Sequence, residues 1–194
     1  NCFQKAAILG HAEAQLKVGE MYAEGKGAAK DLKQAVFWFR NAANNGNPGA
    51  QCSLGLLYLN GIGLEKDYGQ ALSLFKKSAE RGDAQAQYSL GSMYFQGLGT
   101  DKNLEEAVGW YRKSAEQGNA SAQFSIGCAY FKALGVEQDY GQALSWYGKA
   151  AKQGNMEASY NLGIMYFKGL GIGQDRKRAF LLFQKVAEQG DADA

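Results

Sequence analysis

The stretch Ala86-Gln87-Tyr88-Ser89-Leu90-Gly91-Ser92-Met93-Tyr94-Phe95-Gln96-Gly97-Leu98-Gly99 decides the fold, because the chain repeats its pattern every 36 residues. Two positions carry the repeat most clearly: a glycine that follows an aliphatic residue, and a tyrosine three residues later. The glycines are Gly19, Gly55, Gly91, Gly127 and Gly163. The tyrosines are Tyr22, Tyr58, Tyr94, Tyr130 and Tyr166. Self-similarity at a fixed period of about 20–50 residues is typical of a solenoid.

Each repeat predicts a first helix, helix A, that begins after a glycine followed by asparagine or aspartate. In the second repeat this pair is Gly46-Asn47, and Pro48 comes next. Glycine ends the preceding helix in a left-handed conformation, the Asn side chain caps the new helix, and proline fits the first helical position. Helix A is therefore predicted from residue 48 to about residue 60. The equivalent predicted caps are Asp83, Asn119, Asn155 and Asp191, the last after a predicted helix end at Gly190.

A second helix, helix B, is predicted after a loop of the Gly-x-Gly type. In the second repeat the loop begins at Gly61, and Asp67 caps a helix with apolar residues at helical spacing. The fourth repeat has Ala133 in place of the first loop glycine, which predicts a tighter or strained turn. The glycine of helix A costs about 1 kcal/mol of helix stability. We expect it where two helix backbones approach too closely for a Cβ atom.

The pattern predicts an all-α solenoid of five 36-residue helix-turn-helix repeats in a single domain that spans residues 1–194. The repeats are 11–46, 47–82, 83–118, 119–154 and 155–190. Residues 1–10 match the end of a helix B, and residues 191–194 match the start of another helix A. Both ends are therefore expected to lie inside a longer array.

Composition excludes several classes of function. The 21 basic and 19 acidic side chains give a net charge of +2, which is too balanced for nucleic-acid binding by phosphate neutralisation. No apolar run approaches the roughly 18 residues of a membrane-spanning helix, so no direct membrane insertion is expected. The three cysteines, Cys2, Cys52 and Cys128, stand at different repeat positions and predict free thiols. The compartment stays open between periplasmic, secreted and cytoplasmic.

No motif indicates catalysis, a metal or a cofactor. The Gly-x-Gly loops join two helices and lack the Gly-Lys-Ser/Thr of a phosphate loop. His11, the single histidine, stands at the cap position of helix A and is interpreted as an imperfect cap. A catalytic triad or a zinc site cannot be assembled from these residues. The sequence therefore predicts a protein that is not an enzyme.

The third repeat carries a recognisable motif. It reads Gly82-Asp83, Ala86-Gln87, Leu90-Gly91, Tyr94, Gly97, Gly99, Ala107, Trp110-Tyr111, Ser114-Ala115 and Gly118. This pattern resembles the Sel-one-like repeat, a relative of the tetratricopeptide repeat. The main departures are Asn103, Ala133, Leu74 and Leu182, and the disulfide pairs of the cysteine-rich branch of the family are missing. The resemblance implies a right-handed α-α superhelix that acts as an adaptor for partner proteins, without catalytic residues.

The resemblance to tetratricopeptide arrays implies that the A helices line a concave groove. Groove positions differ between repeats, and toward the C-terminus they become more aromatic and change from acidic to basic. We predict that this groove binds a protein or peptide, with aromatic anchors and with lysines that attract an acidic segment or a terminal carboxylate. The predicted contact residues are Tyr88, Ser92, Phe95, Gln96, Phe124, Cys128, Phe131, Lys132, Tyr160, Ile164, Phe167 and Lys168.

Three alternatives stay open at this point. The groove aromatics could instead seal the packing between neighbouring repeats. The chain could be a hydrolase of cell-wall or β-lactam-like substrates, although it lacks a nucleophile–base pair. It could also be a purely structural segment that stacks end to end through apolar faces at Phe3 and at Val186-Ala187.

Overall fold

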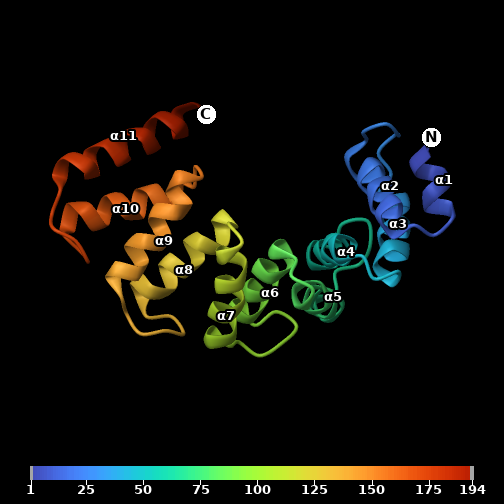
Figure 1. Ribbon diagram of the computed structural model, residues 1–194, viewed down its shortest axis with the longest axis horizontal. Helices are drawn as coiled ribbons and strands as arrows, with labels where there is room; N and C mark the ends of the chain where they lie inside the picture. The colour runs from blue at the N-terminus through green and yellow to red at the C-terminus, as the bar shows by residue number, and fades with distance from the viewer. Residues whose placement is uncertain (1, 193–194) are drawn as a thin grey trace. The chain divides into compact units, whose positions relative to one another are not determined.

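The computed structural model describes the backbone of residues 2–192 and the side chains of residues 3–188, and the regular secondary structure of this part of the chain is all α-helix (Figure 1). The helices are α1 (Cys2–Ile8), α2 (Ala12–Glu24), α3 (Leu32–Asn44), α4 (Pro48–Asn60), α5 (Tyr68–Glu80), α6 (Ala84–Gln96), α7 (Leu104–Glu116), α8 (Ala120–Lys132), α9 (Tyr140–Lys152), α10 (Met156–Lys168) and α11 (Arg176–Ala192). The even-numbered helices are the predicted A helices and the odd-numbered ones are the B helices. The all-α prediction and the helix-turn-helix repeat are confirmed.

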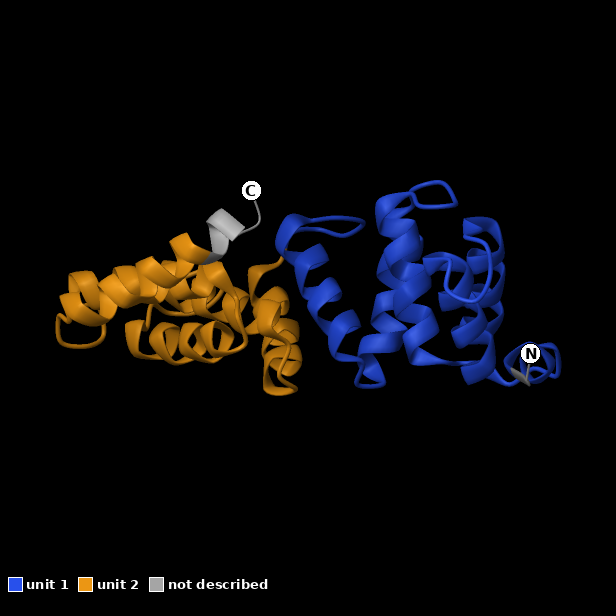
Figure 2. Ribbon diagram, turned by 90° about the horizontal axis from the view of Figure 1, so that it is seen from above, with its two compact units in different colours: residues 1–102 blue, residues 103–194 orange. Residues whose placement is uncertain are grey.

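Helices that follow one another in the chain pack together. The hairpins α2–α3, α4–α5, α8–α9 and α10–α11 form the most extensive contacts, and each B helix also packs on the next A helix, as α3 does on α4 and α9 on α10. The chain divides into two compact units, residues 1–102 and residues 103–194 (Figure 2). The boundary falls in the loop between helix A and helix B of the third repeat. A single domain over the whole chain stays a prediction.

The predicted caps explain where the helices begin. The side-chain oxygen of Asn47 accepts a hydrogen bond from the backbone N–H of Ala50 at 2.9 Å, and Asp83, Asn119 and Asn155 do the same for the alanine three residues on. Asp67 and Asn103 cap B helices in the same way. His11 occupies the cap position of α2 without a side-chain hydrogen bond, which confirms its interpretation as an imperfect cap.

Buried glutamines connect one repeat to the next. Gln123 on α8 is 5% exposed, and its side-chain amide donates a hydrogen bond to the carbonyl of Ala115 at the end of α7, at 3.1 Å. Gln15, Gln51 and Gln87 make the same bond to Ala7, Ala43 and Ala79. The carbonyl of Ala115 also accepts the backbone N–H of Gly118 at 3.0 Å, so the glutamine adds a second donor there and ties the A helix to the end of the preceding B helix.

The glycine of helix A has a different steric reason from the predicted one. A Cβ atom on Gly127 would lie 2.5 Å from Cδ1 of Tyr147, and a Cβ on Gly55 would lie 2.8 Å from Cε1 of Phe75. The obstacle is therefore an aromatic ring of helix B in the same repeat, and the predicted approach of two helix backbones is wrong for this position. Backbone approaches closely at the second loop glycine, because a Cβ on Gly135 would collide with the carbonyl of Leu104.

Ala133 adopts the left-handed conformation that glycine provides in the other repeats. Its φ is +56°, and it is the one residue other than glycine with a positive φ in the described part of the chain. The equivalent Gly61 has a φ of +70°. The predicted strain of this turn is therefore confirmed at the level of the backbone.

The predicted helix end at Gly190 and the predicted cap at Asp191 are wrong, because α11 continues to Ala192. The earlier B helices end in a left-handed glycine, such as Gly154 with a φ of +89°, and α9 ends there although Ser159 replaces the glutamine of the other A helices. At Gly190 the chain stays α-helical instead.

Candidate partner-binding surfaces

In unit 1, the predicted groove positions of the second and third repeats line one hollow. It has a volume of about 160 Å³ and lies between α4 and α6. Tyr88, Ser92 and Gln96 line it from α6, as predicted, and Leu56 and Leu59 line it from α4. Ser89 and Met93 also line the hollow, and the sequence reasoning missed them. Both are almost fully buried, so their repeat positions indicated packing more strongly than surface.

Phe95 does not line this hollow, although it stands on the same helix. Its ring is half-buried, and the ammonium of Lys102 lies 5.6 Å from the ring centroid. The Ser92 hydroxyl donates a hydrogen bond to the carbonyl of Tyr88 at 3.1 Å. Three of the four predicted contact residues on α6 therefore share the hollow, and the fourth contacts a lysine of the following loop.

In unit 2, the rings of Phe124 and Phe131 pack within their own repeat. Their centroids lie 5.8 Å and 6.4 Å from that of Tyr147, which is 1% exposed. Phe131 also contacts the ring of Tyr140 at 5.5 Å. These two phenylalanines are half-buried and support the core around Tyr147. They contribute less exposed surface than predicted for groove anchors.

Cys128 belongs to the same cluster. The hydroxyl of Tyr147 donates a hydrogen bond to its Sγ at 3.3 Å. Burial raises the pKa of the Cys128 thiol, and burial also raises the pKa of the Tyr147 hydroxyl. In unit 1, burial together with the nearby Asp83 carboxylate raises the pKa of the Cys52 thiol. Raised pKa values keep these thiols protonated at neutral pH, so neither is an activated nucleophile.

The most exposed aromatic surface among the predicted residues lies along α10. Tyr160 is 50% exposed and Phe167 is 49% exposed, with the half-buried Ile164 between them. Because residues at i, i+4 and i+7 share one face of a helix, these three form a continuous stripe. Lys168 follows at the end of α10, and Lys132 stands at the equivalent end of α8; both are exposed.

The acidic residues at the same positions of the first repeat are neutralised locally. Glu20 pairs with Lys17 at 2.8 Å, and Glu24 pairs with Lys26 at 2.8 Å. Lys132 and Lys168 make no ion pair with any residue that the structure describes. The exposed lysines of unit 2 are therefore available to an acidic partner, whereas Glu20 and Glu24 of unit 1 are already compensated.

Other kinds of site find no support in the described residues. Within residues 3–188, whose side chains the structure describes, no group of three or more histidine, cysteine, aspartate or glutamate residues could hold a metal ion. In the same part of the chain, no helix combines the length and the apolar character that crossing a membrane requires. At the predicted end faces, Phe3 is 53% exposed and Ala187 is exposed. End-to-end stacking through these faces stays a prediction.

The repeat pattern matches one protein family along nearly the whole chain. The Sel1 repeat matches at residues 12–47, 48–83, 84–119, 120–155 and 157–191. The chain belongs to the Sel1 repeat family. Its fold is therefore an all-α solenoid of five repeats, and the departures at Asn103, Leu74 and Leu182 are tolerated by it.

Solved structures of other Sel1 repeat proteins are similar to the chain. A protective antigen of uropathogenic Escherichia coli strains is 39% identical over 97% of this chain and 48% of the antigen, with a TM-score of 0.84. A Sel1 repeat protein from Oxalobacter formigenes is 35% identical over 93% of this chain and 74% of that protein, with a TM-score of 0.84. An immunity protein from Pseudomonas aeruginosa is 21% identical over 98% of this chain and 72% of that protein, with a TM-score of 0.64, which shows the fold alone. No curated protein matches the chain in sequence.

Proposed function

We propose that this Sel1 repeat chain is a non-enzymatic scaffold that binds a protein or peptide on the A-helix faces of its two units. The observation that carries the proposal is the exposed stripe of Tyr160, Ile164 and Phe167 on α10. Exposed aromatic rings framed by polar groups are typical anchors of protein interfaces. The hollow between α4 and α6 offers unit 1 a smaller site of the same kind.

Electrostatics favours an acidic partner segment. Lys132 and Lys168 end the A helices of unit 2 without an ion pair to any of the described residues. A carboxylate of the partner near these ammonium groups increases the association rate and selects against basic segments. The immunity protein from Pseudomonas aeruginosa shares the fold, and its name describes a role that this chain does not inherit at 21% identity.

Affinity capture with matched variants tests the proposal. Phe167→Ala and Lys168→Glu change the α10 stripe, whereas Phe37→Ala and Lys177→Glu remove an equally exposed ring and an exposed lysine from B helices. We expect partners that the wild-type chain and both B-helix variants retain, and that both α10 variants lose. Retention by all four variants, or equal loss in all four, would place the binding site elsewhere.

A further inference from the structure

Unit 2 contains a hollow of its own, which lies beside its B helices. It has a volume of about 320 Å³ and lies among α9, α10 and α11, where Leu144, Leu162 and Leu182 line it together with Tyr166. An adjoining hollow of about 320 Å³ shares Leu162, Tyr166 and Leu182 and adds Leu181, which is 59% exposed. None of the predicted A-helix contact residues lines either hollow.

Unit 1 has the equivalent hollow, and polar groups occupy it. It measures about 250 Å³ among α3, α4 and α5. The guanidinium of Arg40 donates a hydrogen bond to the hydroxyl of Tyr58 at 3.3 Å across it, and the Oε1 of Gln51 is buried there without a hydrogen-bond partner. In unit 2 the equivalent residues are Gly148 and Ser159, so neither polar group is present. The hollow of unit 2 is therefore open and mainly apolar, whereas the Arg40–Tyr58 hydrogen bond crosses the hollow of unit 1.

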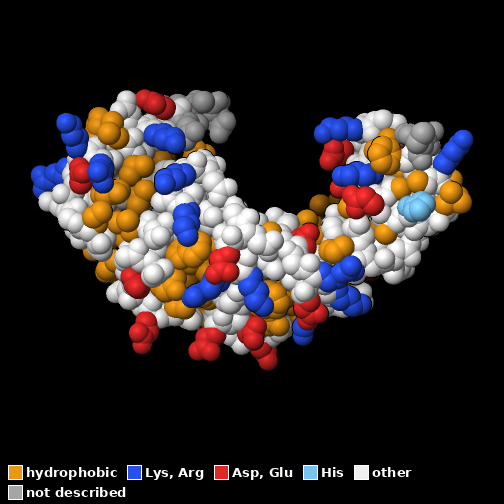
Figure 3. All heavy atoms as spheres, viewed as in Figure 1, with side chains coloured by type: hydrophobic (Ala, Val, Ile, Leu, Met, Phe, Trp, Pro, Cys, Tyr) orange, Lys and Arg blue, Asp and Glu red, His pale blue; other side chains and the backbone are white. Residues whose placement is uncertain are grey.

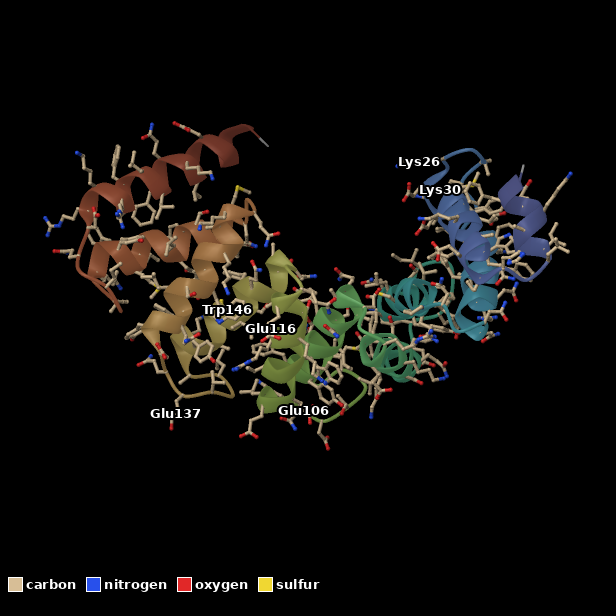
Figure 4. The ribbon with its side chains drawn as sticks, in the orientation of Figure 1. Lys26, Lys30, Glu106, Glu116, Glu137 and Trp146 are labelled. Atoms are coloured by element: carbon tan, nitrogen blue, oxygen red, sulfur yellow. The ribbon has the colours of Figure 1, made fainter. Side chains whose placement is uncertain are left out.

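Both hollows lie where helix B has leucine in place of tryptophan. At the equivalent position of helix B, repeats one, three and four have Trp38, Trp110 and Trp146, whereas repeats two and five have Leu74 and Leu182. Each of these leucines lines one of the two hollows. In repeat four the ring remains, with the ammonium of Lys149 at 3.8 Å from the centroid of Trp146 (Figure 4). A leucine side chain is smaller than an indole ring and takes up less volume at this position.

A following A helix does not cover a hollow of this kind. In unit 1 the equivalent hollow persists although another helix, α6, follows and packs on α5. The hollow lies between consecutive B helices, a surface that the next A helix does not cover.

The rim of the unit 2 hollow is basic. Lys152 and Lys185 line it, and the guanidinium of Arg178 lies 5.6 Å from the ring centroid of Tyr166 at the adjoining hollow. The position of Lys152 is glutamate in repeats two and three, at Glu80 and at Glu116, which Figure 4 marks on α7. Figure 3 shows the result as an exposed hydrophobic area over α10 and α11 with Lys and Arg side chains beside it. Two acidic groups lie close, Asp175 paired with Arg178 and Glu188 bonded to Gln184.

We infer that this hollow is a second docking site, which takes an apolar side chain from an acidic segment of a partner protein. The leucines and Tyr166 accept a leucine-, isoleucine- or phenylalanine-sized group, and Lys152 and Lys185 face the carboxylates that flank it in the segment. The site is separate from the A-helix faces, so one chain can hold two partner segments at once. Apolar anchors with basic rims on two faces suit a scaffold that joins proteins.

The repeats themselves suggest the variants that close the hollow. Leu182→Trp restores the ring of the other repeats. Gly148→Arg has open space at its Cβ and restores the arginine that bonds the tyrosine 18 residues on, as Arg40–Tyr58 and Arg112–Tyr130 do. Gly109→Arg is the matched control. It adds the same side chain on α7 of unit 2, at a position that also has open space at its Cβ.

The experiment is a selection of displayed random heptapeptides on the wild-type chain after depletion on the Leu182→Trp variant. Enriched peptides are then measured individually by fluorescence polarisation. We expect peptides with one large apolar residue between aspartates or glutamates. Their dissociation constants should rise at least tenfold with Leu182→Trp, Gly148→Arg or Lys152→Glu, and stay within twofold with Gly109→Arg or Phe167→Ala.

The inference is overturned if no peptide depends on the open hollow, if the enriched peptides lack acidic residues, or if Gly109→Arg weakens binding equally. Circular dichroism and thermal melting check that each variant is folded. If either Leu182→Trp or Gly148→Arg fails to fold, the other variant still tests whether the hollow binds the peptides. An effect of Phe167→Ala alone would assign the peptides to the A-helix face, which supports the proposed function and contradicts the second site.

Discussion

Replacement of Gly127 by alanine tests the packing that holds each repeat together. The new Cβ would lie 2.5 Å from Cδ1 and 2.7 Å from Cε1 of Tyr147. Carbon atoms pack best at about 3.5–4.0 Å, so the overlap is about 1 Å. The ring cannot move away freely, because it is 1% exposed, packs on Phe124 and Phe131, and bonds Cys128 through its hydroxyl.

The magnitude follows from two opposing effects. Overpacking a rigid core costs about 1–3 kcal/mol, and we expect the upper half of this range for an immobile ring. Alanine also favours the helix over glycine by about 1 kcal/mol. The net result is a loss of about 1–2 kcal/mol in the free energy of unfolding. Gly109→Ala, in α7 with no heavy atom within 4 Å of its Cβ, should instead gain about 0.5–1 kcal/mol.

Urea unfolding followed by circular dichroism measures both variants. Because repeat arrays can unfold without full cooperativity, hydrogen exchange at the amides of α8 and α9 should accompany it. A double-mutant cycle with Tyr147→Leu identifies the obstacle, since the cost of Gly127→Ala should fall by at least half when the ring is absent. An unchanged cost on that background, or a gain in stability like that of Gly109→Ala, would refute the reasoning.

Three further predictions follow from particular contacts. Ala133→Gly should raise the free energy of unfolding by about 0.5–1 kcal/mol, because Ala133 has a φ of +56°; a loss of stability in urea unfolding would contradict this. Gln123→Ala should lower it by about 0.5–1.5 kcal/mol, because the carbonyl of Ala115 loses one of its two donors and keeps the backbone N–H of Gly118; a urea midpoint equal to that of the wild type would count against the bond. Iodoacetamide should modify Cys52 and Cys128 at least tenfold more slowly in the folded chain than in urea at pH 8, because burial raises the pKa of both thiols. Mass spectrometry of the separate peptides measures the two rates. The raised pKa values stabilise the folded chain below the ordinary thiol pKa of about 8.5, and this contribution is lost as the pH rises above that value and the unfolded thiols ionise; equal alkylation rates in the two states would refute the burial.

The candidate surfaces were partly predictable. Groove positions such as Tyr88 and Ser92 were identified from their variation between repeats and from the helical wheel, and they do line one hollow. The same reasoning could not separate Phe131, whose ring packs on Tyr147, from Phe167, whose ring is exposed. Both stand at the same position of helix A. Their exposure differs because it depends on the helix B side chains that each meets.

The sequence by itself determined the number of repeats, the helices and most of their ends. These features depend on groups only a few residues apart, as in the bond from Asn47 to the N–H of Ala50. The tertiary structure alone decided which ring lies against Gly127, and that Gly148, Leu162 and Leu182 surround one hollow. Those residues come from three helices, and a cavity depends on the volumes of all the side chains that meet there. Local hydrogen bonding and periodicity can be read along the chain, whereas the space left between packed helices cannot.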